Sequence, residues 1–375
     1  MKIAFCNRPN YDNPLGGDAV QMLKTKEYLE KAYPVSIDIV TDPKEITQIY
    51  DIVHVFNFVT YKISKQFIFK AKSLGIKVVS SPIYWDYSYV STKILSDIGG
   101  YPKFMSEHRM KFQRKLIKTV GVFSPRPTGV SSFFRKNARW MFDNSDMIAP
   151  NSIEEGRLFL EWIRKKEEAI KKIRVVVNAT TKEIAGSEKE GCSRDAFCAK
   201  YGIPNDYILQ VGRIEYAKNQ LNLIGALCDN PEIPIVFVGR EVDREYSQKV
   251  KKMATARGNV YFIDAVPHDE IKYFYQYAKL HVLLSLRESP GLVNIEALVN
   301  NCPIVISDSR FIPIKTYFEH QPYVANPLKK KNIKETVLRA LNERTVGKFD
   351  IDKFTWEVTA EQTFGIYNEL ININL

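Results

Sequence analysis

The stretch Arg287-Glu288-Ser289-Pro290-Gly291-Leu292-Val293-Asn294-Ile295-Glu296 places two carboxylates on either side of a Ser-Pro-Gly turn. Apolar residues after the turn predict a helix over Leu292–Leu298. Buried strands are predicted on both sides of this segment, over Leu280–Ser285 and over Pro303–Ser307. This order of strand, loop, helix and strand is typical of an α/β fold with a parallel sheet.

The same stretch predicts a binding site for a particular shape of ligand. The first turn of such a helix offers unpaired backbone N–H groups and the positive end of the helix dipole to an anion. Glu288 precedes the helix, whereas Glu296 lies within it, roughly 6 Å beyond Leu292 along the axis. A ligand with phosphate in its middle and hydroxyl groups at both ends fits this arrangement, and a nucleotide sugar is such a ligand.

Length and cysteine content limit the class of protein. The chain has 375 residues, which is enough for two domains. Its cysteines are dispersed and form no CxxC pair, which argues against a disulfide framework or a zinc site and favours reduced thiols in the cytosol. The five positions are Cys6, Cys192, Cys198, Cys228 and Cys302.

Charge and hydropathy indicate the kind of partner. Met1–Cys6 predicts a strand rather than a signal peptide, and no apolar run is long enough to span a bilayer. The net charge of +11 favours an anionic partner, which is nucleic acid, an anionic membrane face or a phosphorylated substrate. The expected location is therefore the cytoplasm.

Two sets of alternating strands and helices predict two domains. The first set has helices over Asp18–Ala32 and Thr60–Leu74, and the chain closes with an amphipathic helix over Thr355–Leu370. The first set of strands covers Lys2–Arg8, Val35–Val40, Ile52–Phe58, Lys77–Ser80, Met147–Ser152 and Arg174–Val177. The second covers Tyr207–Val211, Pro234–Val238, Asn259–Ile263, His281–Ser285 and Ile304–Ser307.

These patterns predict two doubly wound, Rossmann-like domains that face an interdomain cleft. The first would cover residues 1–177 and the second residues 178–352, with a helix in 353–375 packing back on the first domain. Ligands of such sheets bind outside the carboxyl ends of the strands.

Two loops after predicted strands contain phosphate-binding residue types. Gly212 ends a strand and allows close backbone approach, and Arg213 and Lys218 then place two cations that match a diphosphate. Arg213 and Lys218 are explained equally well as solvated cations of a surface loop that bind no ligand. Gly16 and Gly17 follow the first strand, where their N–H groups can meet phosphate, although Gly-Gly is also an ordinary turn.

Taken together, the spacings resemble the GT-B retaining glycosyltransferases of the family 4 type (glycosyl transferases group 1). The resemblance covers most of the chain and is strongest from Tyr207 to Ser307. The matching residues are Gly16-Gly17, Gly212-Arg213 with Lys218, Val238-Gly239-Arg240, Val260-Tyr261-Phe262, Glu288 through Glu296, and Phe354-Thr355-Trp356.

The resemblance implies roles for individual residues. Arg213 and Lys218 would hold the donor diphosphate and stabilise the leaving nucleotide, and Glu288 would accept hydrogen bonds from the donor sugar. These three are the implied catalytic residues. The other implied donor-binding residues are Gly16, Gly17, Gly212, Pro290, Gly291, Leu292, the ribose acceptor Glu296, and Val266 near the base.

Some positions depart from the family pattern. Many members carry a histidine near the end of the fourth strand, and this chain has none there. Tyr84 or Asp86 is expected to take its place on the acceptor side, and His54 either lines the cleft or lies near the core. Asn178-Ala179 replaces the usual Asn-Gly and Asp264 the usual glycine of the base loop, which leaves the sugar open.

The expected activity is a retaining, metal-independent transfer of a hexose from a nucleotide sugar. A UDP-sugar is favoured and a GDP-sugar is possible; the acceptor is a glycan or lipid-linked molecule in surface polysaccharide, glycoprotein or glycolipid synthesis. Two alternatives stay open. One is a nucleotide-sugar epimerase of GT-B architecture, and the other is a non-catalytic basic protein that binds membrane or nucleic acid on a GT-B scaffold. The sequence does not identify the base, sugar, acceptor, linkage or oligomeric state.

A basic stretch runs from Lys103 to Arg139, with Glu107 as its one acidic residue and apolar side chains interleaved. This composition suits peripheral docking at an anionic membrane, on the inner face of the cytoplasmic membrane. A solvated helix face is the alternative, and nucleic acid ranks lowest because no nucleic-acid-binding motif accompanies the charge.

Overall fold

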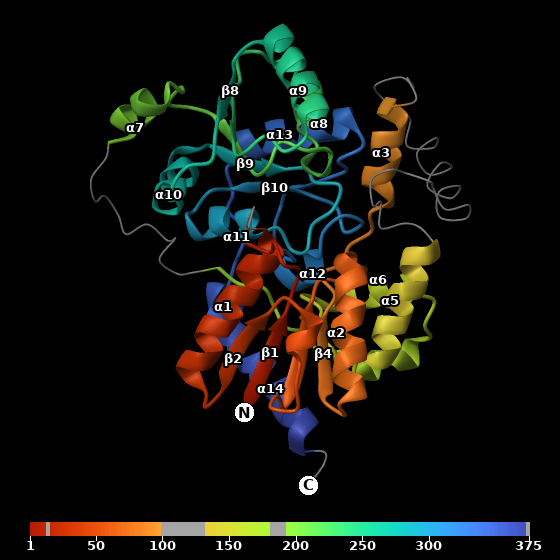
Figure 1. Ribbon diagram of the computed structural model, residues 1–375. Helices are drawn as coiled ribbons and strands as arrows, with labels where there is room; N and C mark the ends of the chain where they lie inside the picture. Colours follow the sequence, from red (N-terminus) through yellow and green to blue (C-terminus); the bar gives the residue numbers. More distant parts are fainter. Residues whose placement is uncertain (13–15, 99–131, 181–192, 373–375) are drawn as a thin grey trace. The chain divides into compact units, whose positions relative to one another are not determined.

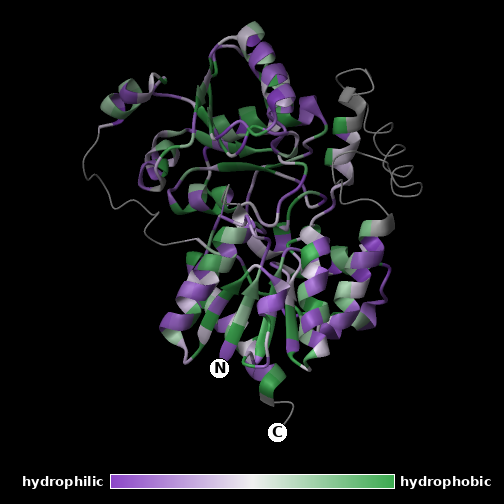
Figure 2. Cartoon of the chain, viewed as in Figure 1, coloured by the Kyte–Doolittle hydropathy of each residue, from purple (hydrophilic) through white to green (hydrophobic). Residues whose placement is uncertain are grey.

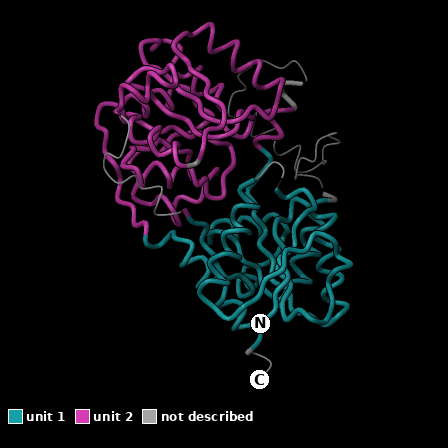
Figure 3. Tube along the Cα trace, turned by 60° about the vertical axis from the view of Figure 1, so that its left-hand side comes forward, with its two compact units in different colours: residues 1–88, 115–179, 352–375 teal, residues 89–114, 180–351 magenta. Residues whose placement is uncertain are grey.

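The computed structural model describes residues 1–12, 16–98, 132–180 and 193–372 (Figure 1). The described residues fall into two compact units (Figure 3). Unit 1 is drawn from residues 1–88, 115–179 and 352–375, and unit 2 from residues 89–114 and 180–351. Each unit contains one parallel sheet.

Unit 1 is built on a five-stranded parallel sheet in the order β2-β1-β3-β4-β5. Its central strands are almost wholly buried because helices cover both faces, as parallel sheets require. The strands are β1 (Lys2–Cys6), β2 (Ser36–Val40), β3 (Ile52–Phe56), β4 (Lys77–Ser81) and β5 (Met147–Ile148).

Two apolar clusters hold the helices of unit 1 on its sheet. Phe67 of α2 and Phe159 of α6 belong to one cluster, and Met22 of α1 and Tyr367 of α14 belong to the other. Arg174 of the segment after the sheet also pairs with Glu369 of α14. The helices are α1 (Gly17–Ala32), α2 (Tyr61–Ser73), α5 (Ser132–Asn144), α6 (Ile153–Trp162) and α14 (Trp356–Asn372), with 3-10 turns η1 (Pro43–Glu45), η2 (Phe58–Thr60), η3 (Glu167–Lys172) and η6 (Ile351–Phe354).

The expected strand over Arg174–Val177 is wrong. This segment is extended and lies beside β5, with backbone bonds from Arg174 N–H to Ile148 O and from Val176 N–H to Pro150 O. A ladder does not form there because Pro150 has no N–H to donate in return. For the same reason β5 ends at Ile148 rather than reaching Ser152.

Unit 2 is built on a six-stranded parallel sheet in the order β11-β10-β9-β6-β7-β8. Its strands are mostly apolar, whereas the helices around them alternate between apolar and polar residues (Figure 2). The strands are β6 (Ile208–Val211), β7 (Ile235–Val238), β8 (Val260–Ile263), β9 (Leu280–Leu283), β10 (Ile304–Ser307) and β11 (Val324–Ala325). The helices are α7 (Arg194–Tyr201), η5 (Tyr216–Lys218), α8 (Gln220–Ala226), α9 (Arg244–Arg257), α10 (His268–Tyr277), α11 (Leu292–Val299), α12 (Ile314–Tyr317) and α13 (Lys330–Glu343).

One helix of unit 2 comes from the first half of the sequence. Val90 and Ile94 of α3 (Ser88–Ile98) pack against the apolar core of unit 2. The Tyr89 ring lies 4.6 Å from that of Phe311, and the ammonium of buried Lys93 donates to the side-chain oxygen of Asn219. The sequence pattern did not predict this crossing of the chain between units.

The described residues contain neither a candidate membrane-spanning helix nor a candidate metal-binding cluster. None of their helices is both long and apolar enough to cross a membrane. They also contain no cluster of three or more His, Cys, Asp or Glu side chains placed to hold a metal ion. Among the cysteines that the structure describes, Cys6, Cys198, Cys302 and Cys228 are free thiols, and only Cys228 is exposed.

Two buried histidines make the stability of both units sensitive to acid. His54 of β3 lies between the hydroxyls of Tyr367, 2.6 Å from Nδ1, and Ser81, 2.9 Å from Nε2. Burial lowers the pKa of His54 from 6.5 to about 3, and burial likewise lowers the pKa of His281 in β9 to about 3. Each ring is therefore neutral in the folded protein at pH values where the unfolded chain binds a proton.

We expect folding stability to fall as the pH drops from 6.5 toward 3, because protons bind preferentially to the unfolded state. The contribution of His54 alone should lower the free energy of unfolding by about 2 to 3 kcal/mol at pH 4.5 relative to pH 7. Urea unfolding of the protein and of His54→Gln at both pH values measures this as a smaller acid-induced loss in the variant. Equal losses in the two proteins would contradict the assignment.

Candidate functional site

The strand order of unit 2 places a topological switch point between β6 and β9. The chain crosses from β6 to β7 and β8 on one side and to β9, β10 and β11 on the other, so connections diverge above these two central strands. Ligands of doubly wound sheets bind at the carboxyl ends of the strands at this switch point. The loops after β6 and β9 meet there, where Leu286 N–H donates to Ala217 O at 2.8 Å.

Lys218 and Glu288 lie together at this switch point. The Lys218 ammonium contacts Glu288 Oε1, and the two side chains are 15% and 10% exposed. The Ser285 hydroxyl donates to the same carboxylate oxygen at 2.6 Å, and Gln210 Nε2 donates to the Lys218 carbonyl at 2.8 Å. A cation and a carboxylate are thus held side by side, each fixed by a neighbour from the central strands or the loops that follow them.

Two glycines make room for this arrangement. Gly212 and Gly239 end the adjacent strands β6 and β7 with φ values of +144° and +143°. A Cβ on Gly239 would lie 2.5 Å from the Gly212 carbonyl oxygen, so only glycine permits the two backbones to approach. A Cβ on Gly212 would lie 3.5 Å from Cε of Lys218, which shows that the lysine stem runs across this glycine.

Arg213 is less restrained than Lys218. Its guanidinium lies 3.0 Å from Glu215 Oε1, and its side chain is 57% exposed. Its carbonyl accepts from Gln220 Nε2 at 2.9 Å. The structure therefore places both predicted cations in the loop after β6, but it ties them to different carboxylates.

The second carboxylate of the opening motif, Glu296, lies on α11. Gly291 caps this helix with φ +92°, and Glu288 is fixed by its N–H bond to Phe311 O. The Tyr275 hydroxyl donates to Glu296 Oε2 at 2.9 Å. Burial, followed by the charge of Glu296, raises the pKa of Tyr275, so the hydroxyl keeps its proton and orients the carboxylate.

Beneath these loops lies a buried polar pair that the sequence did not indicate. Val211 N–H donates to Nε2 of His281 at 3.3 Å, which places the ring proton on Nδ1. The Asn294 side chain is buried beside it and beside Gly291. Of the other predicted donor residues, Pro290 is buried, Leu292 is half-buried, and Val266 is half-buried in the loop between β8 and α10.

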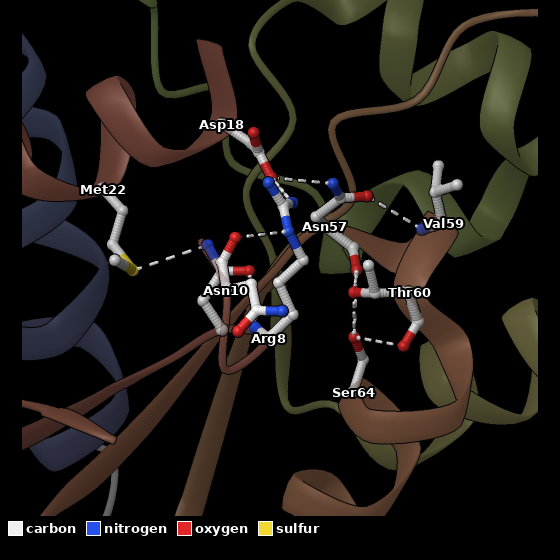
Figure 4. Close-up of polar contacts among 9 residues, drawn as sticks. Arg8, Asn10, Asp18, Met22, Asn57, Val59, Thr60 and Ser64 are labelled. Atoms are coloured by element: carbon white, nitrogen blue, oxygen red, sulfur yellow. Dashed lines mark hydrogen bonds and ion pairs between the residues drawn. The ribbon is translucent and has the colours of Figure 1, made fainter. Parts of the chain in front are cut away.

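Unit 1 has a corresponding switch point between β1 and β3, where a polar network forms (Figure 4). The Arg8 guanidinium pairs with Asp18 Oδ2 at 2.7 Å, and Asn57 Nδ2 donates to the same oxygen at 3.0 Å. Asn57 has φ +70°, which its side-chain bond to Val59 N–H stabilises. A Cβ on Gly16 would lie 2.6 Å from the Asp18 carboxylate, and Gly17 begins α1.

The expected acceptor-side residues have different surroundings. The ring of buried Tyr84 stacks on Trp162 at 4.6 Å, and its N–H donates to Glu155, a buried carboxylate that the sequence analysis missed. His54 also lies in the core, and these positions favour packing roles for both residues. Asp86 is buried and accepts from Ser88 N–H at 2.8 Å. The part that any of the three plays in binding an acceptor stays a prediction.

The two parallel-sheet α/β units have the GT-B glycosyltransferase fold. The structure is similar to that of sucrose-phosphate synthase from Thermosynechococcus elongatus, with a TM-score of 0.73 and 16% identity over 100% of both chains. It is also similar to that of Anabaena HepE in complex with UDP and glucose, with a TM-score of 0.63 and 14% identity over 98% of this chain and 95% of the other.

Sequence comparisons match part of the chain to glycosyltransferases. Residues 194–349, less than half of the chain, match the family model of glycosyl transferases group 1. An uncharacterized glycosyltransferase of Methanocaldococcus jannaschii is 25% identical over 184 residues, which cover 46% of this chain and 47% of that protein. Sulfoquinovosyl transferase of Arabidopsis thaliana is 32% identical over 107 residues, 28% of this chain and 20% of that protein. The chain thus spans about half or less of these two relatives.

Proposed function

We propose that the protein is a retaining, metal-independent glycosyltransferase that moves a hexose from a nucleotide sugar to a glycan or lipid-linked acceptor. The observation that carries the proposal is the Lys218–Glu288 pair at the switch point of unit 2, inside the segment that matches glycosyl transferases group 1. A doubly wound sheet binds its ligand at the switch point, and the switch point of unit 2 combines a cation for phosphate with a carboxylate for hydroxyl groups.

The chemistry assigned to these groups is electrostatic. Departure of a nucleoside diphosphate builds negative charge on the leaving oxygen, and a fixed cation in a partly desolvated site stabilises that charge. We assign this role to Lys218, which is partly buried, and assign to the exposed Arg213 a second contact with the same diphosphate. Glu288 then accepts hydrogen bonds from the donor sugar, and attack on the sugar from the face of the leaving group requires no protein nucleophile.

The nucleotide end of the donor is assigned to α11 and the loop before α10. Glu296, oriented by Tyr275, accepts from the ribose hydroxyls, and Val266 lies near the base. A UDP-sugar is the favoured donor, and the complex of Anabaena HepE with UDP and glucose supports this choice. A GDP-sugar is the second choice.

The acceptor is assigned to unit 1, where the Arg8–Asp18–Asn57 network occupies the switch point of the sheet. Polar groups of this kind suit the hydroxyl and phosphate groups of a glycan or lipid-linked acceptor. The proposed setting is surface polysaccharide, glycoprotein or glycolipid synthesis in the cytoplasm, at the inner face of the membrane. Of the proposed docking stretch Lys103–Arg139, residues 103–131 lie outside the described residues.

Nucleotide binding is the first test. UDP, GDP and ADP are added without metal to the intact protein, to Glu296→Ala and to Tyr275→Phe, and thermal unfolding is recorded. Ligand at one hundred times its Kd adds about 2.7 kcal/mol of stability. We expect one nucleotide to stabilise the intact protein, and both variants to bind it more weakly because one lacks the ribose acceptor and the other its orienting hydroxyl. No shift with any nucleotide would contradict the proposal.

Turnover then separates the enzymatic alternatives. Nucleotide release that depends on an added acceptor supports the transferase. Conversion of the donor without acceptor identifies an epimerase instead, and absence of both reactions with intact nucleotide binding would leave a non-catalytic binding protein.

A further inference from the structure

A basic pocket on the surface of unit 1 shares no lining residue with the Arg8–Asp18–Asn57 network or the Lys218–Glu288 pair. Its volume is about 540 Å³, and it lies between η1 and the outer face of α2. Four of its seven lining residues are lysines and none is acidic. The lining residues are Pro43, Lys44, Lys62, Lys65, Gln66, Phe69 and Lys70.

No carboxylate of the described residues neutralises the lysine charges of this pocket. Within the described part of the chain, no carboxylate pairs with Lys44, Lys62 or Lys70. Lys65 donates to the Asn137 side-chain oxygen at 3.2 Å and lies over the Trp140 ring, again without a carboxylate. The one acidic residue of η1 is Glu45, which is exposed and does not line the pocket.

An exposed aromatic ring accompanies these charges. Phe69 is 67% exposed, one of three large apolar side chains that stand out from the surface among the described residues. Another is Ile49, 63% exposed, on the connection that carries Pro43 and Lys44. The neighbouring helix α5 adds Lys136 and Arg139, both exposed, so the basic surface extends beyond the pocket.

We infer that this face of η1 and α2 docks on an anionic phospholipid surface. Lysines attract anionic headgroups as mobile point charges, and a protruding phenylalanine enters the interface between headgroups and acyl chains. A free phosphate ligand would leave Phe69 without a role. Nucleic acid is less well matched, because the pocket has a single aromatic ring and no arginine fork for phosphate.

Vesicle co-sedimentation tests the inference without any nucleotide or acceptor, so its outcome is independent of the proposed function. Vesicles of phosphatidylcholine with and without phosphatidylglycerol are compared at low and at high ionic strength. The intact protein should bind only the anionic vesicles, and mainly at low salt. Lys62→Gln/Lys70→Gln should bind them about thirty-fold more weakly, and Phe69→Ser at least about tenfold more weakly.

A matched control removes the same charge elsewhere. Lys31→Gln/Lys331→Gln changes two exposed lysines of α1 and α13 and should bind vesicles like the intact protein. Unchanged binding in the pocket variants, or an equal loss in the control, would overturn the inference. Displacement by inorganic phosphate at constant ionic strength would assign the pocket to a free phosphate ligand. Preference for a single-stranded oligonucleotide over vesicles would assign it to nucleic acid.

Discussion

Replacing Lys218 by alanine is expected to lower turnover by about 100- to 1,000-fold while the fold persists, because a fixed charge at a developing anion contributes on this scale. The effect should fall on kcat more than on KM, since the charge on the leaving diphosphate grows toward the transition state. Glu288→Ala should lose most turnover as well, because it removes the contact with the donor sugar. Acceptor-dependent release of nucleotide measures both.

The control for this prediction is Lys251→Ala, which removes a lysine of unit 2 that is half-exposed and pairs with Glu241. Its turnover should equal that of the intact protein. Near-normal turnover in both Lys218→Ala and Glu288→Ala would refute the site assignment. Loss of turnover together with a lower unfolding temperature would instead indicate a structural role for the pair.

Replacing Arg257 by methionine is expected to destabilise unit 2 by about 3 to 4 kcal/mol. This guanidinium is 9% exposed at the end of α9 and donates to Leu227 O at 2.9 Å, Asn230 O at 2.6 Å and Ile233 O at 2.7 Å. Methionine has a similar volume but leaves these carbonyls without a donor. Urea unfolding at neutral pH gives the difference in free energy.

Arg244→Met provides the comparison, because Arg244 is exposed in the first turn of the same helix. Arg244→Met should change the free energy of unfolding by no more than about 0.5 kcal/mol. If the two variants unfold at the same urea concentration, the carbonyls around Arg257 do not need their donor.

The sequence predicted the features that depend on residues close together in the chain. The strands of unit 2 are short apolar runs, and Gly212, Lys218 and Glu288 lie in the segments that follow two of them, so the position of each after a strand end was readable from the chain. Parallel strands bring their carboxyl ends to one edge of the sheet, which is why two loops seventy positions apart meet at Lys218 and Glu288.

The features that sequence reasoning missed depend on contacts between distant segments. Tyr275 looks like any apolar-face residue of its helix until α11 places Glu296 against its hydroxyl. The crossing of α3 into unit 2 is decided by Tyr89 and Lys93, whose partners are Phe311 and Asn219. The residue pattern within one helix does not reveal these contacts, because the partner residues lie in distant parts of the sequence.

The return of α14 to unit 1 has a consequence for synthesis on the ribosome. Its Tyr367 and Leu370 complete a core that Ile3 and Phe5 begin, and Thr359 and Gln362 bond to the backbone at Val177. The face of the first sheet that α1 and α14 share therefore stays only partly covered until residues 356–372 have been made, whereas unit 2 is already complete at residue 351. The later half of the chain should thus reach its native state first, and a fragment that ends near residue 179 should expose apolar surface and aggregate.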